Sequence, residues 1–366
     1  MAVGEAVNGC SGYGTAADPY VPENFLGFRN AVGVAGAYVC MMNDIDVSKD
    51  AVYKTGITYA VTVNAAYIYG TAMTFSNTKT YNIGDVCTFN DGEHGLCTYT
   101  CLADGTVGVD VTDTTYWDRG GDPTKKLTGL MVTAAKFLDM SSSSATVYVE
   151  NIFFESCVFD CTSLSTNSAG FIYHGANIVT FYDCKFSIFF NQHQSWSAYF
   201  ISNGGQTTTS GFSRCSIYVR YTYTSFPSTN TESKFSSAYT TFTNCTTNII
   251  GMSFVVYSPQ TSSFGKHVRS SIVMSEIGVR RVNSSSVFPI PYATNCFISI
   301  SFKSVNDSAL KMTKTTLSGV NVFDKEAAQA IPGCTVTITS DGNLIQGTTA
   351  QCKDKDWLIS KGFFTS

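Results

Sequence analysis

The chain carries little charge. Asp, Glu, Lys and Arg together make up 14% of its 366 residues, whereas soluble domains average about 25%. Ser and Thr take the place of the charged residues, and a surface of that kind suits a solenoid or a large oligomer. The net charge is −4 at pH 7. The chain therefore has no excess of basic residues, and nucleic acid is not expected as a partner.

Signals for membranes and for export are also missing. No run of about 18 apolar residues occurs, so no membrane insertion is expected. The N-terminus, from Met1 to Glu5, has no basic region followed by an apolar core, so no secretory signal is expected. We therefore predict that the 13 cysteines are reduced and structural.

Motifs for catalysis are lacking too. The sequence contains no motif of an activated nucleophile. Three of the histidines have no partner at the spacing of a metal site or a catalytic triad: His174, His193 and His267. We predict no catalytic residue, no metal and no cofactor. Stacking of the repeat described next could bring Glu155, Asp183 and Arg214 together. The alternative interpretation of these three residues is a solvated bend with paired charges.

What the sequence does contain is a repeat. The motif Phe-x-x-Cys occurs four times, and its cysteines are separated by 27, 31 and 30 residues: Phe154–Cys157, Phe181–Cys184, Phe212–Cys215 and Phe242–Cys245. A near-constant period of this size indicates one supersecondary unit stacked on itself. β-Branched and aromatic residues surround each copy, and no amphipathic helical stretch interrupts them. The unit is therefore predicted to consist of strands.

Phe and Cys three residues apart would point to opposite faces of a flat strand. Both point inward if the chain bends at the two residues between them, which are mostly polar. A strand, a bend, a strand and a return loop make one coil of a parallel β-helix. Like residues then stack in ladders about 4.8 Å apart, and we expect Ser275 and Cys296 to continue the Cys ladder. A β-sandwich is the structural alternative.

The first 70 residues carry a further pattern. A Gly- and Asp-rich turn at residues 14–20 precedes a helix candidate at 23–32 and strand candidates at 37–42, 59–63 and 66–70. This order resembles the opening of right-handed parallel β-helix proteins, and the resemblance implies a cap and the first coils. The expected fold class is all-β: a right-handed parallel β-helix (solenoid) with a small inserted β module and a C-terminal cap.

The inserted module is predicted from a spaced set of residues: Tyr81, Gly84, Asp85, Phe89, Tyr99, Cys101, Tyr116 and Trp117. The set resembles the chitin-binding type of carbohydrate module that occurs in phage tail proteins and secreted glycosidases. Cys87 stands where that family has Val, and the usual Pro-rich stretch before the last Trp is missing. Residues 91–95 also lengthen the first hairpin.

In that family, surface aromatic residues stack on sugar rings, because a flat ring fits the apolar face of a pyranose. The resemblance implies that Tyr99, Tyr116 and Trp117 bind sugar, with core packing as the alternative. Trp196 lies in a long return segment and is a fourth candidate for sugar binding. Core packing is its alternative as well.

The C-terminal segment differs in composition from the repeats. Helix candidates at 324–330 and 354–362 flank a hairpin signal at 340–342. We expect this segment to cover the open end of the solenoid. The predicted organisation is an N-terminal cap with the first coils, the inserted module, the parallel β-helix and the C-terminal cap, at residues 1–80, 81–122, 123–323 and 324–366.

Taken together, the coils, the sugar-module pattern, the low charge and the unsignalled N-terminus resemble a bacteriophage virion appendage protein: a tail fibre, head fibre or spike. The resemblance implies a structural protein rather than an enzyme, assembled in the host cytoplasm and located in the virion. Its expected partners are two further copies in a homotrimer, other virion proteins and a host-surface polysaccharide. The alternatives are a polysaccharide lyase or hydrolase (depolymerase) on the same scaffold and a bacterial surface adhesin.

Overall fold

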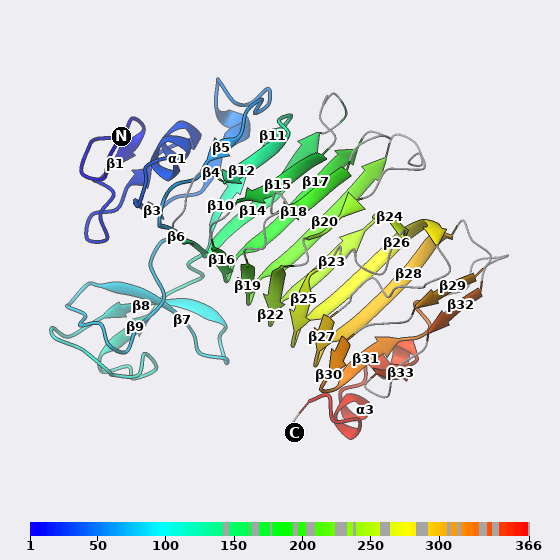
Figure 1. Cartoon of the computed structure of the whole chain (residues 1–366). Helices are drawn as coiled ribbons and strands as arrows, with labels where there is room; N and C mark the ends of the chain where they lie inside the picture. Colours follow the sequence, from blue (N-terminus) through cyan, green and yellow to red (C-terminus); the bar gives the residue numbers. More distant parts are fainter. Residues whose placement is uncertain are drawn as a thin grey trace.

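The chain folds mainly into parallel β-sheets (Figure 1), so the prediction of an all-β chain is confirmed. The structure is a computed structural model, and it describes residues 1–141, 146–160, 162, 168–175, 178–192, 197–202, 209–223, 233–236, 239–256, 264–282, 292–305, 309–312, 316–328, 335–338 and 344–364. Trp196, one of the predicted sugar-binding residues, lies outside the described residues, as does His193.

Three parallel sheets form the body of the molecule. Within the described residues, sheet 1 contains β3 (Tyr38–Met41), β6 (Tyr67–Gly70), β13 (Val147–Glu150), β16 (Val179–Tyr182), β19 (Ser210–Ser213), β22 (Thr240–Thr243), β25 (Lys266–Val268), β27 (Tyr292–Thr294) and β30 (Thr316–Ser318). Each strand of sheet 1 pairs in parallel with the one listed next to it.

Sheet 2 is the longest of the three. Its described strands are β4 (Ile45–Asp46), β10 (Lys125–Thr128), β14 (Ile152–Asp160), β17 (Lys185–Gln192), β20 (Ser216–Tyr223), β23 (Thr246–Ile250), β26 (Ser271–Val282), β28 (Phe297–Val305), β31 (Asn321–Asp324) and β33 (Leu344–Gly347), with β11 (Met131–Val132) and β24 (Ser253–Val256) beside that path.

Sheet 3 contains β5 (Val61–Thr62), β12 (Lys136–Met140), β15 (Ser168–His174), β18 (Ser197–Ser202) and β21 (Ser233–Lys234). The chain visits sheets 1, 2 and 3 in that order, for example through β13, β14 and β15, and then returns to sheet 1. We call one such passage a repeat. Strands that are neighbours in a sheet therefore come from consecutive repeats, which is the arrangement that the Phe-x-x-Cys period predicts.

Aromatic rings stack along the interior of sheet 1. Phe181, Phe212 and Phe242 occupy equivalent positions of β16, β19 and β22, with ring centroids 4.7 Å and 5.0 Å apart. The imidazole of His267 continues the stack on Phe242 at 4.7 Å. All four side chains are buried. Burial of a Phe side chain contributes about 1.5–3 kcal/mol, so this ladder is a main source of the core's stability.

The first copy of the motif lies elsewhere. Phe154 sits within β14 opposite Phe186 of β17, and the pairing of these strands shifts register between Phe154 and Cys157. Ser156, with φ of 52°, forms this β-bulge. The prediction that Phe154 belongs to the same ladder as Phe181 is therefore wrong. A bulge and a corner each place a left-handed residue between Phe and Cys, so the motif alone does not distinguish them.

Cysteines form a second internal row, where sheet 1 turns into sheet 2. The thiols of Cys184, Cys215 and Cys245 donate to backbone oxygens of the preceding repeat at 3.4, 3.5 and 3.4 Å. Cys296 continues the row, as predicted. The prediction for Ser275 is wrong. Ser270 occupies that place, and its hydroxyl makes the equivalent bond to the Phe242 oxygen at 3.2 Å.

An antiparallel sheet interrupts the parallel ones. It consists of β7 (Val86–Asn90), β8 (Leu96–Cys101) and β9 (Trp117–Arg119), which lie between β6 of sheet 1 and β10 of sheet 2. We call residues 71–124 the module. It has a hydrophobic cluster of its own, which is separate from the core of the parallel sheets: Tyr81, Cys87, Cys97, Tyr99, Cys101, Val111 and Trp117.

The N-terminal helix forms close to where the sequence places it. Helix α1 (Phe25–Val32) begins after Asn24, whose side chain accepts from the Gly27 N–H. Two short strands precede it, β1 (Cys10–Ser11) and β2 (Val21–Pro22), which pair antiparallel. The 3-10 helix η1 (Val47–Lys49) follows β4.

The C-terminal segment is predicted in part. Helix α3 (Lys355–Ser360) begins after Asp354 and follows the short helix α2 (Thr349–Cys352). The helix predicted from residue 324 is wrong, because Asp324 ends β31 and turns follow it. The turn of the predicted hairpin, residues 340–342, lies outside the described residues, and the two strands that flank it each pair with another strand. β32 (Thr335–Ile338) pairs in parallel with β29 (Ala309–Met312), whereas β33 pairs in parallel with β31.

Candidate functional site

A row of left-handed residues marks the corner between sheets 1 and 2. From β6 to β30, one residue after each strand of sheet 1 has positive φ, and we call these residues the corner row: Thr71, Asn151, Asp183, Arg214, Asn244, Arg269, Asn295 and Gly319. From Asn151 to Asn295, the N–H of each corner residue donates to a carbonyl of the next repeat, at 2.8–3.2 Å. The side chains of the row are thus presented from a rigid backbone at the spacing of the sheet, about 4.8 Å.

The corner row contains a position at which stability should improve. Arg269 has φ of 47°, and Asn tolerates this region better than Arg because its short side chain bonds locally. We expect Arg269→Asn to raise the free energy of unfolding by about 1 kcal/mol, measured by thermal denaturation. Arg269→Val is the matched control. A β-branched residue is the least suited to positive φ, so an increase in stability with Val would contradict this explanation.

Charged members of the corner row pair along it. Arg214 donates to both carboxylate oxygens of Asp183, from Nε at 2.8 Å and from Nη2 at 2.6 Å. The hydrogen bonds that Arg214 donates to the Asp183 carboxylate raise the pKa of Arg214. Asp183 is largely buried, whereas 40% of the Arg214 side chain is exposed, so the guanidinium faces outward from a fixed position.

Of the acidic cluster considered from the sequence, only Asp183 and Arg214 come together. Glu155 lies in the bulge of β14 and accepts a bond from Lys126 at 2.9 Å. This hydrogen bond to the Glu155 carboxylate raises the pKa of Lys126. The interpretation of paired charges on a bend therefore fits these residues better than a cluster of two acids around one arginine.

The module is fixed to the corner by buried polar contacts. The Glu150 carboxylate, 4% exposed, accepts from the N–H and the hydroxyl of Thr74 at 3.3 Å and 2.9 Å. Burial raises the pKa of Glu150, although its hydrogen bonds oppose the rise. The Asn151 amide reaches Thr88 of β7 at 3.4 Å. These contacts set the direction in which the module leaves the parallel sheets.

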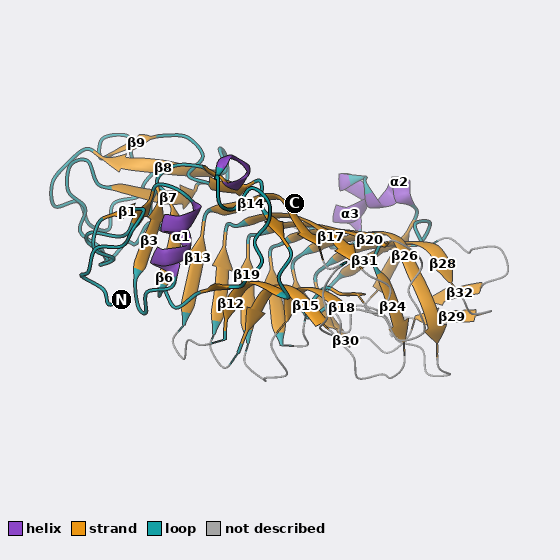
Figure 2. Ribbon diagram, turned by 90° about the horizontal axis from the view of Figure 1, so that it is seen from above, coloured by secondary structure: helices purple, strands orange, loops and turns teal. Residues whose placement is uncertain are grey.

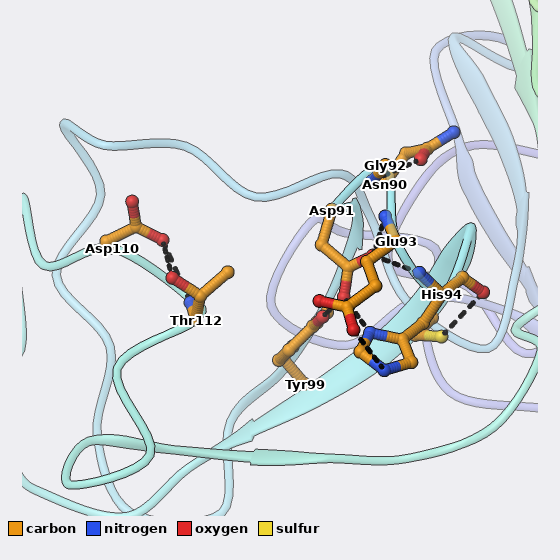
Figure 3. Close-up of polar contacts among 9 residues, drawn as sticks. Asn90, Asp91, Gly92, Glu93, His94, Tyr99, Asp110 and Thr112 are labelled. Atoms are coloured by element: carbon orange, nitrogen blue, oxygen red, sulfur yellow. Dashed lines mark hydrogen bonds and ion pairs between the residues drawn. The ribbon is translucent and has the colours of Figure 1, made fainter.

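A tight turn between β7 and β8 carries the module's polar tip (Figure 3). Asp91 accepts from the His94 N–H at 2.7 Å, from the Tyr99 hydroxyl at 2.7 Å and from the Glu93 N–H at 3.1 Å. Its other contact is with His94 Nδ1 at 2.9 Å. The His94 N–H and the Tyr99 hydroxyl hold the pKa of Asp91 well below its usual range. Asp91 therefore fixes the His94 ring at the edge of the module.

A cleft of about 570 Å³ separates this tip from the corner row. One wall comes from the module, with Asn90, His94 and Leu96 among its residues. The other wall comes from consecutive repeats of sheet 2 and the corner row: Asp183, Lys185, Arg214, Ser216, Asn244 and Thr246. We call it the first cleft. Amides, hydroxyls, an imidazole and a guanidinium converge on it, and this is the chemistry that recognises sugar hydroxyls.

A second cavity of about 630 Å³ lies on the module itself. Tyr99 and Trp117, two of the predicted sugar-binding residues, contribute to its lining. Both side chains are almost fully buried in the module's own cluster, at 3% and 2% exposed. The alternative of core packing therefore accounts for these two residues. Tyr116 is 36% exposed, and of these three it presents the most surface.

The sequence did not point to Lys185 and His94 as site residues, and it placed Asn244 on a bend beside Arg214 without assigning it a role. The signal for Asn244 was present, because it directly precedes a repeat cysteine, as do Asp183 and Arg214. No local signal marks His94 as a neighbour of residues that lie about 100 positions further along the chain. Within the described residues, no group of three or more His, Cys, Asp or Glu side chains is placed to hold a metal ion.

The cysteines of the described segments are free thiols, and ten of the eleven are buried. Burial raises the pKa of Cys40 to about 11 and that of Cys87 to about 12. Protonated, buried thiols are poor nucleophiles and poor metal ligands. Their geometry agrees with the structural role expected from the sequence.

Comparisons with protein-family models, with curated proteins and with solved structures find no match to this chain. No helix in the described part of the chain is both long and apolar enough to cross a membrane.

Proposed function

We propose that the chain is a structural protein of a bacteriophage virion, an appendage of the fibre or spike type that attaches the particle to a glycan on the host surface. In this proposal the three sheets wind as a right-handed parallel β-helix. Two further copies complete a homotrimer, and other virion proteins anchor it. The repeated order of sheets 1, 2 and 3 supports the winding, and the in-register ladders support a rigid rod.

The first cleft is the observation that carries the glycan-binding proposal. Most of its lining residues are polar, and they offer both donors and acceptors. It is built from rigid repeats on one side and from a fixed turn on the other. A glycan bound there would meet Asn244, Arg214 and His94 without a rearrangement of the backbone. Pre-organisation of this kind lowers the entropic cost of binding, and several copies on one particle would add avidity.

A binding role accounts for the acids of the cleft better than a depolymerase does. Inverting and retaining glycosidases need one carboxylic acid that donates a proton to the leaving oxygen. Both oxygens of Asp183 are engaged by Arg214, and Asp122 accepts from Lys185 at 3.2 Å. The chain is therefore proposed to bind its glycan without hydrolysing it.

Substitution of Asn244 tests the cleft. Asn244→Gly removes the side-chain amide and keeps the left-handed backbone, since glycine adopts positive φ freely. We expect the affinity for a glycan identified on an array to fall about three- to tenfold, the effect of losing a neutral hydrogen bond. Asn295→Gly is the matched control, because Asn295 has the same φ of 53° but does not line the cleft. Equal losses in both variants would contradict the proposal.

A further inference from the structure

Strand β20 connects the first cleft with another cavity. Its inward side chains, Ile217, Val219 and Tyr221, are buried, so the alternate positions face outward. In order along the strand, the outward residues are Ser216, Tyr218, Arg220 and Thr222. Ser216 lines the first cleft. Arg220 and Thr222 line a cavity of about 310 Å³, which we call the third cavity.

The two hollows lie close enough for one extended ligand. Ser216 and Arg220 are four residues apart on the strand, which corresponds to about 13 Å. Figure 2 shows the module and the helices α2 and α3 on the same side of the parallel sheets, near opposite ends, with strands of sheet 2 between them. We call the outer face of sheet 2 between the module and these two helices the floor. The module borders it near one end of the sheet, and helices α2 and α3 border it near the other.

An aromatic pair occupies the middle of this floor. Tyr218 is half-buried and packs against Phe189 of the neighbouring strand β17, with ring centroids 5.9 Å apart and planes inclined by 58°. Both residues stand between outward polar positions of their strands. An aromatic surface with polar groups on either side suits the apolar faces of sugar rings.

The third cavity has an excess of positive charge. Arg220 and Lys303 are cationic, and Glu276 is its one acidic lining residue among those described. No ion pair within the described residues involves Arg220 or Lys303. This local excess stands out in a chain whose net charge is −4. Unpaired cations beside a cavity attract anionic groups of a ligand.

We propose that the glycan of the proposed function is a linear acidic polysaccharide that crosses sheet 2 along β20. It runs from the first cleft over Tyr218 to the third cavity, where Arg220 and Lys303 contact its anionic groups, either carboxylates or sulfates. This inference rests on the proposed function and adds the charge of the glycan, its extended form and its path.

An array of linear polysaccharides tests the inference with the full chain. The acidic probes are hyaluronan and polysialic acid, which carry carboxylates only, and heparin, which also carries sulfates. The neutral probes are cellulose and amylose fragments of matched lengths. We expect an acidic probe to bind at least about tenfold tighter than the neutral ones and to weaken as salt rises. We expect hexasaccharides to bind at least about tenfold tighter than disaccharides, because only the longer ligand reaches both hollows.

Variants locate the path. Tyr218→Ala and the pair Arg220→Met with Lys303→Met should each lower the affinity for the acidic hexasaccharide about tenfold, and the methionine pair should remove most of its salt dependence. Tyr239→Ala and Lys353→Met are matched controls, since both residues are exposed and line none of the three hollows.

The outcomes separate the inference from the proposed function. Tight binding of neutral probes alone overturns the acidic path and leaves glycan attachment standing. The same conclusion follows if Asn244→Gly weakens binding and the Tyr218, Arg220 and Lys303 variants leave it unchanged. The absence of binding to every probe, acidic and neutral, counts against the proposed function itself.

Discussion

Replacement of Phe212 by alanine is expected to lower the free energy of unfolding by about 3–5 kcal/mol, the cost of a large cavity in a core. The Phe212 ring stacks on Phe181 and Phe242 at 4.7 Å and 5.0 Å. It also meets Phe200 and Phe186 at 5.7 Å and 5.9 Å. Because neighbouring repeats hold these rings on both sides, the space left by the side chain cannot collapse. Urea denaturation followed by circular dichroism measures the loss.

Phe364→Ala is the matched control for this change, because Phe364 is 47% exposed. The same chemical change there should shift stability by no more than about 0.5 kcal/mol. Comparable losses in the two variants would show that the ladder does not carry the stability of the core. A loss below about 1 kcal/mol at Phe212 would show that the neighbouring repeats do relax around the missing ring.

The sequence predicts the interior of the sheets better than it predicts their order. Phe181, Phe212 and Phe242 stack because a fixed period places the same residue at the same point of every repeat. Phe154 has the same local motif and lies in sheet 2 opposite Phe186. A motif of four residues cannot separate a bulge from a corner, since each needs one left-handed residue followed by an inward side chain.

The candidate site is a harder problem, because tertiary placement creates it. His94 and Asn244 face the same cleft, and only the direction in which the module leaves the corner brings them together. Trp117 shows the reverse problem. An aromatic residue that matches a sugar-binding pattern also matches the requirements of a small core, and its burial of all but 2% of its surface places it in that core. Patterns of residue type alone do not separate the two roles.

Acid is expected to destabilise the protein through His267, which occupies a Phe position of the ladder. The His267 side chain is fully buried against Phe242, and its Nε2 lies 2.7 Å from the Phe264 oxygen. Burial lowers the pKa of His267 from 6.5 to about 4. The unfolded chain therefore binds a proton below about pH 6.5 that the folded chain does not take up until about pH 4. Between these values, stability falls with falling pH, by about 3 kcal/mol in total.

His267→Phe isolates this contribution because it keeps an aromatic ring in the stack and removes the titrating group. Loss of the bond to the Phe264 oxygen and the larger ring shift the stability of the variant at every pH, whereas the pH-dependent contribution of His267 disappears. Denaturation at pH 7.5, 6, 5 and 4 should therefore show that the wild-type protein loses about 3 kcal/mol more stability than His267→Phe between pH 7.5 and pH 4. His94→Phe is the control, since His94 is partly exposed on the module and outside the ladder. If the wild-type and His267→Phe curves stay parallel down to pH 4, the imidazole of His267 is protonated in the folded protein without cost, and the ladder is open to water at that position.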